Sequence, residues 1–280
     1  MNRLRTASTL ALAAAFAAAL QAGAPQNGQQ QAPAGRAGWP CGARLDASYF
    51  GLAEGTGGHL LLLAPEEIAD STALLMAFDQ HPQTISRTAG TIQRGLREFS
   101  VPIDSSVESV LFSMSVQCLQ RAEVVRPSGG PAIGDDVTDL SNFRAERMVI
   151  VRRPQPGTWT MRVEGSGVGG IVVQARTSTA ISQVEFATPP NERFTAVPSA
   201  GVENTLRLRI RGVTSEVHGA LVDGTSRHLA DLALEAGDGE GLFAARVNPG
   251  TTPFRVLVTG QDAEGRAFQR MSAPLLTPAR

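Results

Sequence analysis

The chain has 280 residues, and its 25 basic and 26 acidic side chains leave a formal net charge of −1 at pH 7. This balance gives no electrostatic reason to expect nucleic acid as a partner. The length is sufficient for two domains, each with a hydrophobic core of its own.

The first 24 residues have the features of a secretory signal peptide. Arg3 and Arg5 precede an apolar run over residues 10–20, and small residues follow at Ala22 and Ala24. The run is about half as long as the ~20 residues that a membrane-spanning helix requires, so a membrane anchor is the less favoured alternative. We expect a secreted, extracellular protein without a membrane span once the signal peptide is removed.

Residues 25–44 are rich in Gln, Ala, Pro and Gly, and we expect them to form a flexible linker. The two cysteines of the chain are Cys41 and Cys118. In an oxidising compartment, a disulfide between them is the expected arrangement. Two free thiols, or pairing with another chain, are the alternatives.

Residues 45–94 predict a short α/β segment. Asp46 can cap a helix that ends at glycines 55, 57 and 58, and the apolar run over residues 60–63 is typical of a buried strand. Pro65 then stands where a second helix would begin, and apolar residues follow it at helical spacing as far as Asp79.

From about residue 96 the apolar period changes to two, which predicts a mostly-β chain. Short β-type runs separated by turn residues indicate a jelly-roll, galactose-binding-like sandwich over residues 95–188. The pair Pro189–Pro190 marks the next boundary, and residues 189–280 suit an immunoglobulin-like sandwich. The cysteine–tryptophan–cysteine signature of true immunoglobulin domains is absent.

Two short motifs suggest chemistry that their contexts do not support. Residues 165–170 read G-x-G-x-x-G, but a strand-like run follows them where a nucleotide site needs a helix, so we predict a hairpin turn. Residues 104–109, DSSVES, resemble the ion-binding loop of a von Willebrand A domain. Their position between two predicted strands favours a simple turn.

Asp135, Asp136 and Asp139 form the acidic loop GDDVTDL. Three carboxylates within five residues could provide oxygen ligands for calcium, which makes them the metal candidates of this chain. A solvated acidic turn is the alternative, and we expect no other cofactor.

The four histidines, His59, His81, His218 and His228, stand in no recognisable catalytic context, and there is no G-x-S-x-G motif. We expect no enzymatic activity and name no catalytic residue. A triad can nevertheless be assembled from residues that are far apart in sequence.

Arg207, Arg209 and Arg211 alternate with apolar residues, so a β-strand would place all three guanidinium groups on one face. Such a row could bind an acidic glycan or an acidic protein, since arginine pairs with carboxylates and similar anions in a bidentate manner. The alternative is a solvated face paired with acidic residues of the neighbouring strand.

The order of several runs resembles a known family. Residues 49–63, YFGLAEGTGGHLLLL, look like the last α/β unit of a von Willebrand A domain. The runs LREFSVPIDSSVESVLFSMSV, PGTWTMRVEGSG and PFRVLVTGQDAEGRAFQR are similar to the sandwich domains that follow it in hemicentins and in the von Willebrand factor A domain-containing protein 7 family. The resemblance covers residues 46–280 and implies that the front of the A domain, with its ion site, is missing here.

The resemblance implies an adhesion protein or extracellular-matrix scaffold without catalysis, whose partner is an extracellular protein or an acidic glycan. Two alternatives remain open at this point. One is a calcium-assisted carbohydrate-binding module, and the other is a secreted hydrolase with an unrecognised triad.

Overall fold

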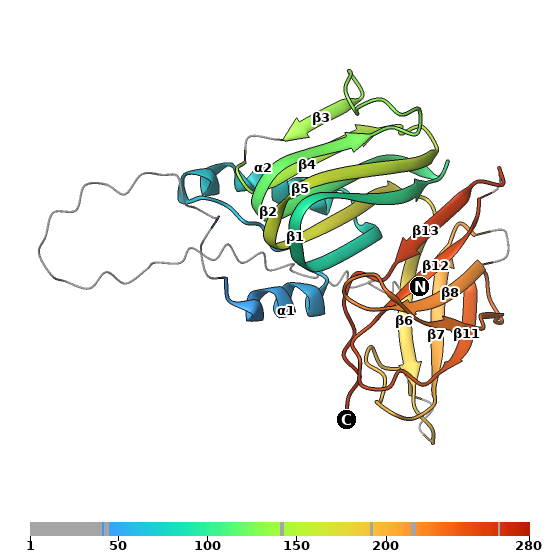
Figure 1. Cartoon of the computed structure of the whole chain (residues 1–280). Coiled ribbons are helices and arrows are strands. Elements are labelled where there is room, and N and C mark those ends of the chain that lie inside the picture. Colours follow the sequence, from blue (N-terminus) through green and yellow to red (C-terminus); the bar gives the residue numbers. More distant parts are fainter. Residues whose placement is uncertain (1–40, 42–44, 141–142, 191–192, 214–216, 263) are drawn as a thin grey trace, which may run out of the picture.

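A computed structural model of the chain describes residues 41, 45–140, 143–190, 193–213, 217–262 and 264–280. The expected signal peptide and most of the expected linker lie outside these residues. In the described part, the strands form three sheets with antiparallel pairing, and the helices are confined to residues 47–79 (Figure 1). The prediction of a mostly-β fold is confirmed.

The first unit of the molecule consists of a helical layer and a five-stranded sheet. The helical layer contains α1 (Ala47–Thr56), the 3-10 helix η1 (Pro65–Asp70) and α2 (Ser71–Asp79). The sheet has the order β1-β5-β2-β4-β3 and contains β1 (Gln83–Ile103), β2 (Val107–Val125), β3 (Val137–Leu140), β4 (Glu146–Arg152) and β5 (Gly157–Thr177).

The second unit contains two four-stranded sheets. One has the order β10-β11-β7-β6 and contains β6 (Ala180–Ala187), β7 (Asn204–Arg211), β10 (Glu235–Ala236) and β11 (Leu242–Val247). The other has the order β13-β12-β8-β9 and contains β8 (Val217–Val222), β9 (His228–Leu232), β12 (Arg255–Gln261) and β13 (Ala267–Met271). One core cluster draws buried residues from both sheets, so the unit is a sandwich.

Local sequence signals specify both ends of α1. The Asp46 carboxylate accepts a hydrogen bond from the Ser48 amide at 2.9 Å, which is the geometry of a helix N-cap. At the other end, Gly57 adopts φ 71°, a left-handed conformation that favours glycine. Pro65 begins η1, as expected, and α2 continues the chain to Asp79.

Residues 60–63 are not a strand, so the prediction of a buried strand there is wrong. The segment packs Leu61 and Leu63 against a cluster on the face of the first sheet, together with α2. It therefore crosses the face of the sheet and does not lie along an edge where a hydrogen-bonded ladder could form. A buried strand and a segment packed across the face of a sheet both require apolar side chains, so the apolar run over residues 60–63 is compatible with either structure.

The glycines at 165–170 lie inside β5, so the predicted hairpin turn is also wrong. β5 is continuous over 21 residues, and it pairs with β1 on one side and with β2 on the other. A Cβ atom on Gly169 would lie 2.7 Å from the carbonyl oxygen of Ser115, so the glycine allows the two strands to approach closely.

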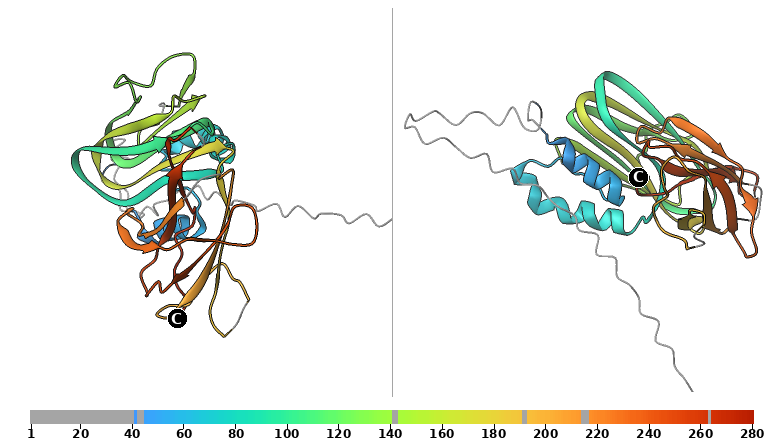
Figure 2. Two further views of the ribbon diagram at one scale, coloured as in Figure 1. Left: turned by 90° about the vertical axis from the view of Figure 1, so that its right-hand side faces the viewer. Right: turned by 90° about the horizontal axis from the view of Figure 1, so that it is seen from below.

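The long strands bend so strongly that one sheet encloses its own core. Ile85 and Ile103, near opposite ends of β1, belong to the same buried cluster as Trp159. Register shifts between Ile92 and Gly95 in β1, and at three points in β2, accompany the bend. The helical layer covers the opposite face of this sheet (Figure 2), where Leu74 and Phe78 of α2 are buried.

One expected boundary falls within a strand, and another separates a strand from the rest of its sheet. The expected boundary between residues 94 and 95 lies inside β1. The sequence pattern missed the first half of this strand because polar side chains such as Thr84 and Arg87 are buried there and interrupt the apolar alternation. The expected boundary between residues 188 and 189 follows β6 (residues 180–187) and separates it from β7 of the second unit, although β6 pairs with β7.

The expected disulfide between Cys41 and Cys118 is present, with a Cα–Cα distance of 4.7 Å. Cys118 lies on β2 opposite Ser166 of β5, so the bond attaches the chain ahead of α1 to the first sheet.

Candidate functional site

The arginine row of β7 lies on the outer face of its sheet, as predicted from the period-2 pattern. Leu206, Leu208 and Ile210 are completely buried in the core of the second unit. The alternating residues therefore point outward, and Arg211 is exposed. We define the arginine face as this outer surface of β7 together with the outward residues of β6 and β11.

The first arginine of the row is held by two neighbours. The Nε atom of Arg207 donates to the Glu185 carboxylate of β6 at 3.2 Å, and its guanidinium carbon lies 3.8 Å from the ring centre of Phe194. The hydrogen bond from Arg207 holds the pKa of Glu185 below its ordinary value. This part of the face matches the structural alternative, in which an arginine pairs with an acid of the next strand.

The other two arginines of the row are less engaged. The Nη1 atom of Arg209 donates to the backbone carbonyl of Glu240 at 3.2 Å. Among the described residues, no ion pair joins Arg209 or Arg211 to a carboxylate. Since the strand rises ~3.4 Å per residue, these two guanidinium groups start from backbone positions about 7 Å apart.

Phe194 is the residue of this face that sequence reasoning missed. It lies between β6 and β7 in the chain, in a segment joined to β6 by hydrogen bonds between Phe186 and Thr195. Nothing in the local sequence indicates that its ring would stack on Arg207, because the contact depends on how the connection folds back.

The acidic loop does not form a metal centre in the described structure. Asp136 makes two hydrogen bonds with Arg126, at 2.9 and 3.0 Å, and Asp139 bonds Arg147 at 2.6 Å. Because different arginines hold these two carboxylates, the loop does not bring them and Asp135 together. Throughout the described residues, no group of three His, Cys, Asp or Glu side chains could hold a metal ion.

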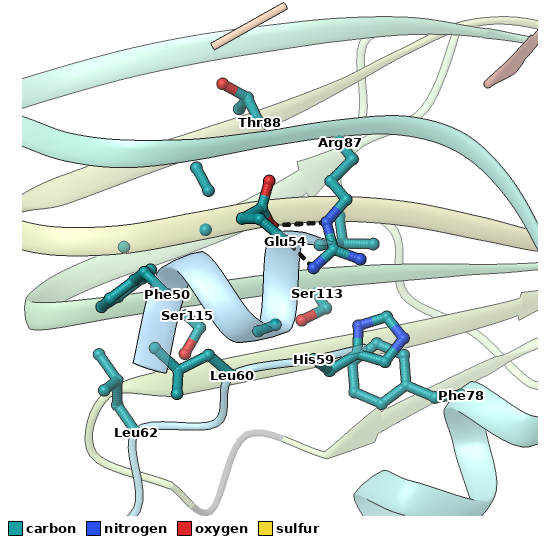
Figure 3. A pocket seen from close by; sticks show the side chains of 15 residues that line it. Phe50, Glu54, His59, Leu60, Leu62, Phe78, Arg87, Thr88, Ser113 and Ser115 are labelled. Carbon is teal, nitrogen blue, oxygen red and sulfur yellow. Dashed lines mark hydrogen bonds and ion pairs between the residues drawn. The ribbon is translucent and has the colours of Figure 1, made fainter. Parts of the chain in front are cut away.

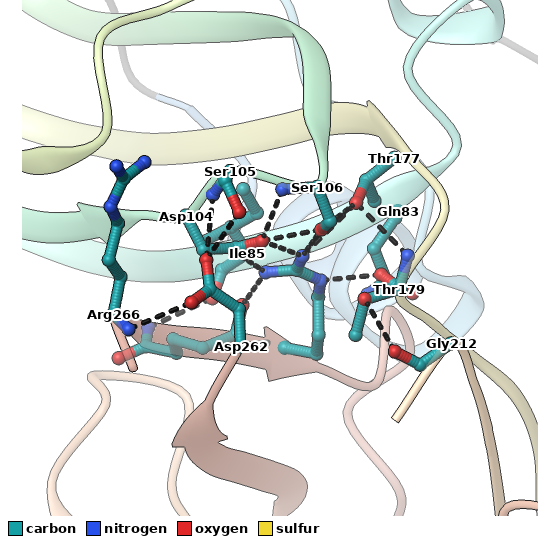
Figure 4. A network of polar contacts seen from close by, with 12 residues as sticks. Gln83, Ile85, Asp104, Ser105, Ser106, Thr177, Thr179, Gly212, Asp262 and Arg266 are labelled. Atoms are coloured by element: carbon teal, nitrogen blue, oxygen red, sulfur yellow. Dashed lines mark hydrogen bonds and ion pairs between the residues drawn. The ribbon is translucent and has the colours of Figure 1, made fainter. Parts of the chain in front are cut away.

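Residues 104–106 form the turn between β1 and β2, as predicted, but Asp104 is completely buried. Its carboxylate accepts hydrogen bonds from Arg270 of β13 at 2.7 and 3.1 Å (Figure 4). Arg270 also donates to Ser106 and Thr177, so the turn of the first unit receives a buried cation from the second unit. Asp104 therefore has a structural role in this turn.

A second buried ion cluster joins α1 to the first sheet and to the second unit. The Glu54 carboxylate of α1 accepts a hydrogen bond from Arg87 Nε at 2.8 Å (Figure 3). It also accepts a hydrogen bond from Arg255 of β12. A small cavity of about 20 Å³ lies beside Glu54, with His59 and Ser115 in its wall. This volume corresponds to about one water molecule, so the cavity is no substrate pocket.

Burial lowers the pKa values of two histidines, His59 and His81, which favours their neutral forms. Burial, followed by the charge of Arg87, lowers the pKa of His59 to about 3, and its ring stacks on Phe78 with 3.5 Å between the ring centres. Burial is also the main cause that lowers the pKa of His81.

Within the described residues, one contact resembles a hydrolase dyad, and it involves His81. Its Nδ1 atom lies 2.6 Å from the carbonyl oxygen of Ala77, so Nδ1 carries the proton and Nε2 accepts from the Ser109 hydroxyl at 3.0 Å. The place of a triad carboxylate is thus occupied by a backbone carbonyl. Of the other two, His228 contacts Asp231 on the exposed strand β9, and His218 is exposed on β8.

Comparison with known proteins gives no family for this chain. No family model and no curated protein matches the sequence. Solved structures give distant matches, and in the three described below this chain covers at most 40% of the other protein's chain.

The first match is the Bacillus licheniformis lipase BlEst2 in propeptide form, at 12% identity over 68% of this chain and 40% of the lipase, with a TM-score of 0.34. The β-D-glucuronidase of Dictyoglomus thermophilum follows, at 10% identity over 63% of this chain and 35% of that chain, with a TM-score of 0.23. The β-glucuronidase of Bifidobacterium dentium matches at 7% identity over 63% and 38%, with a TM-score of 0.22.

No helix in the described part of the chain is long and apolar enough to cross a membrane.

Proposed function

We propose that this chain is a secreted, non-enzymatic scaffold or adhesion protein that binds an acidic partner through the arginine face. The observation that carries the proposal is the state of Arg209 and Arg211. Both point outward from a rigid sheet, and no ion pair among the described residues occupies them with a carboxylate. Their guanidinium groups can therefore donate hydrogen bonds to carboxylate or sulfate groups of a partner.

The construction of the face supports this proposal. Every inward residue between the arginines is completely buried, so the backbone that carries the row is fixed by the core. A preorganised row loses less conformational entropy on binding than arginines on a flexible loop would lose. The disulfide supports the expected location, because such bonds persist in oxidising compartments.

The experiment measures binding of two polyanions, heparin and poly-aspartate, to the full chain. A double charge reversal, Arg209→Glu with Arg211→Glu, should weaken binding at least about tenfold, since each charged hydrogen bond contributes about 1.5–3 kcal/mol. The matched control is Arg94→Glu with Arg97→Glu, two exposed arginines on β1 of the first unit, which should bind as the unmodified chain does.

Equal binding by the arginine-face variant and the control would contradict the proposal, because the face would then be merely solvated. Absence of binding to both polyanions at low salt would also contradict it.

A further inference from the structure

The outer surface of the helical layer exposes an unusual number of large apolar side chains. Five of them lie between residues 49 and 76: Tyr49, Leu52, Ile68, Leu75 and Met76. Leu52 and Met76 are 55% and 56% exposed. Single exposed apolar residues are ordinary on protein surfaces, but their concentration on one layer indicates an interaction site.

Helix α1 is apolar on its covered side and on its open side. Phe50 and Ala53 face the interior beside Glu54, while Tyr49 and Leu52 are exposed. A surface helix normally has a polar outer face, and one that is apolar all round is normally buried. Its composition therefore fits a helix that a partner covers.

The charge of this layer is acidic. Residues 46–86 contain no lysine and no arginine, whereas Glu66, Asp70 and Asp79 are exposed acids of η1 and α2. Glu66 pairs with Arg144 at 2.9 Å, so Asp70 and Asp79 are the acids that carry the charge of this surface. A partner of this surface should therefore combine apolar side chains with arginine or lysine.

The arginine face has that composition. Leu242 and Ala244 of β11 lie directly opposite Arg209 and Arg207, so they share the outward face with the row. Phe194 adds its ring beside Arg207. One surface of this chain is thus acidic and apolar, and the other is basic and apolar.

We infer that the helical layer of one copy of this chain binds the arginine face of a second copy. This inference rests on the proposed function, and it names the acidic partner of the same site. The two surfaces belong to different units, so the contact is heterologous and leaves one free surface at each end. Repetition produces chains or rings, which is an assembly that a scaffold protein requires.

The test measures the mass of the full, disulfide-bonded chain by sedimentation at increasing concentration. The mass should rise with concentration beyond that of a dimer. It should fall at high salt, because the Debye length shortens from about 10 Å at 0.1 M to about 3 Å at 1 M.

Two variants each remove one of the surfaces. Arg209→Glu with Arg211→Glu disables the arginine face, and Asp70→Arg with Asp79→Arg disables the helical layer. Asp70 makes no side-chain cap hydrogen bond, and a cation at position 79 suits the C-terminus of α2, so this second variant should fold. Each variant alone should be monomeric at concentrations at which the unmodified chain associates.

A mixture of the two variants gives the sharpest result. Each variant retains the surface that its counterpart lacks, and the two reversed surfaces are also complementary in charge. The mixture should therefore associate again beyond a dimer, although each variant alone does not. A chain that carries all four reversals should associate again, because its helical layer is then basic and the outer face of its β7 is then acidic. The control Asp135→Arg with Asp231→Arg alters two exposed acids elsewhere and should associate like the unmodified chain.

A chain that stays monomeric at low salt and high concentration would overturn the inference, as would association that neither variant weakens. Binding of a foreign protein to the helical layer of a monomeric chain would assign the surface to another occupant and would also overturn it. The proposed function is judged separately, because the helical-layer variant keeps its arginine face and should still bind poly-aspartate.

Discussion

At the scale of single residues, Glu146 is the group whose chemistry is most altered by its position. It is completely buried on β4, opposite Ser115 of β2, and it accepts a hydrogen bond from Ser113 at 2.8 Å. Burial raises its pKa to about 7, and the hydrogen bond from Ser113 opposes that shift only in part. The carboxyl group therefore stays protonated in the folded chain under conditions in which it would ionise when unfolded.

This arrangement makes the stability depend on pH in a defined direction. Below pH 4.5 both states carry the proton, and the folded chain has its full stability. As the pH rises toward 7, the unfolded chain loses the proton while the folded chain retains it, so the free energy of unfolding falls. Above pH 7 the loss is complete, and at ~1.4 kcal/mol per pH unit it amounts to about 3 kcal/mol.

The variant Glu146→Gln should remove this dependence. It should be more stable than the unmodified chain at pH 8 by up to about 3 kcal/mol, and close to it at pH 4. Urea unfolding of both proteins across this range measures the difference. Parallel pH profiles for the two proteins would show that Glu146 is not the titrating group.

At the scale of elements, the bend of the first sheet depends on glycines that have unequal roles. A Cβ atom on Gly169 would meet the Ser115 carbonyl oxygen at 2.7 Å and Ile92 at 3.0 Å, whereas one on Gly170 would find nothing closer than 3.8 Å. Because backbone cannot move aside as a flexible side chain can, the first contact requires the strands to separate.

Gly169→Ala should therefore destabilise the chain by about 1–3 kcal/mol. Gly170→Ala is the matched control, and it should be neutral or stabilising by up to about 1 kcal/mol, since alanine restricts the unfolded chain. Thermal or urea unfolding of both variants measures the difference. Equal stabilities would mean that β5 and β2 are not in close contact at this point.

The same glycines show what could not be predicted from the sequence. The runs TWTMRVEG and GIVVQART predict two strands joined by a turn, because glycines between β-type runs are the usual signal of a hairpin. In the structure, β5 continues through them, since its partners β1 and β2 bend at the same place. A bend that three strands share is a tertiary property, and a single run contains no signal for it.

Other features were predictable because they depend on neighbours in sequence. The cap of α1 by Asp46 and the alternation of β7 each follow from local geometry, and both are confirmed. Residues 207, 209 and 211 are therefore on one face as expected, although the stacking of Phe194 on Arg207 was not foreseeable. Nor was the bond between Glu54 and Arg255, whose positions are 201 residues apart.

At the scale of the whole molecule, two buried ion clusters connect the two units. Glu54 of α1 binds Arg255 of β12, and Asp104 of the β1–β2 turn binds Arg270 of β13. The side chains of Asp104 and Arg270 are both fully inaccessible to solvent. A buried pair of this kind contributes little compared with a well-packed apolar pair, but removal of one partner leaves a buried charge without compensation.

Asp104→Ala should therefore destabilise the chain by about 3–5 kcal/mol, because the Arg270 guanidinium remains buried between the units. The matched control is Glu98→Ala, which breaks the exposed pair with Arg162 and should cost about 0–1 kcal/mol. The double variant Asp104→Ala with Arg270→Met should be more stable than Asp104→Ala alone, since the uncompensated charge is then gone.

Calorimetry distinguishes these cases and shows whether the units of Asp104→Ala unfold in separate transitions. If Asp104→Ala lost no more stability than Glu98→Ala, this ion pair would not hold the two units together.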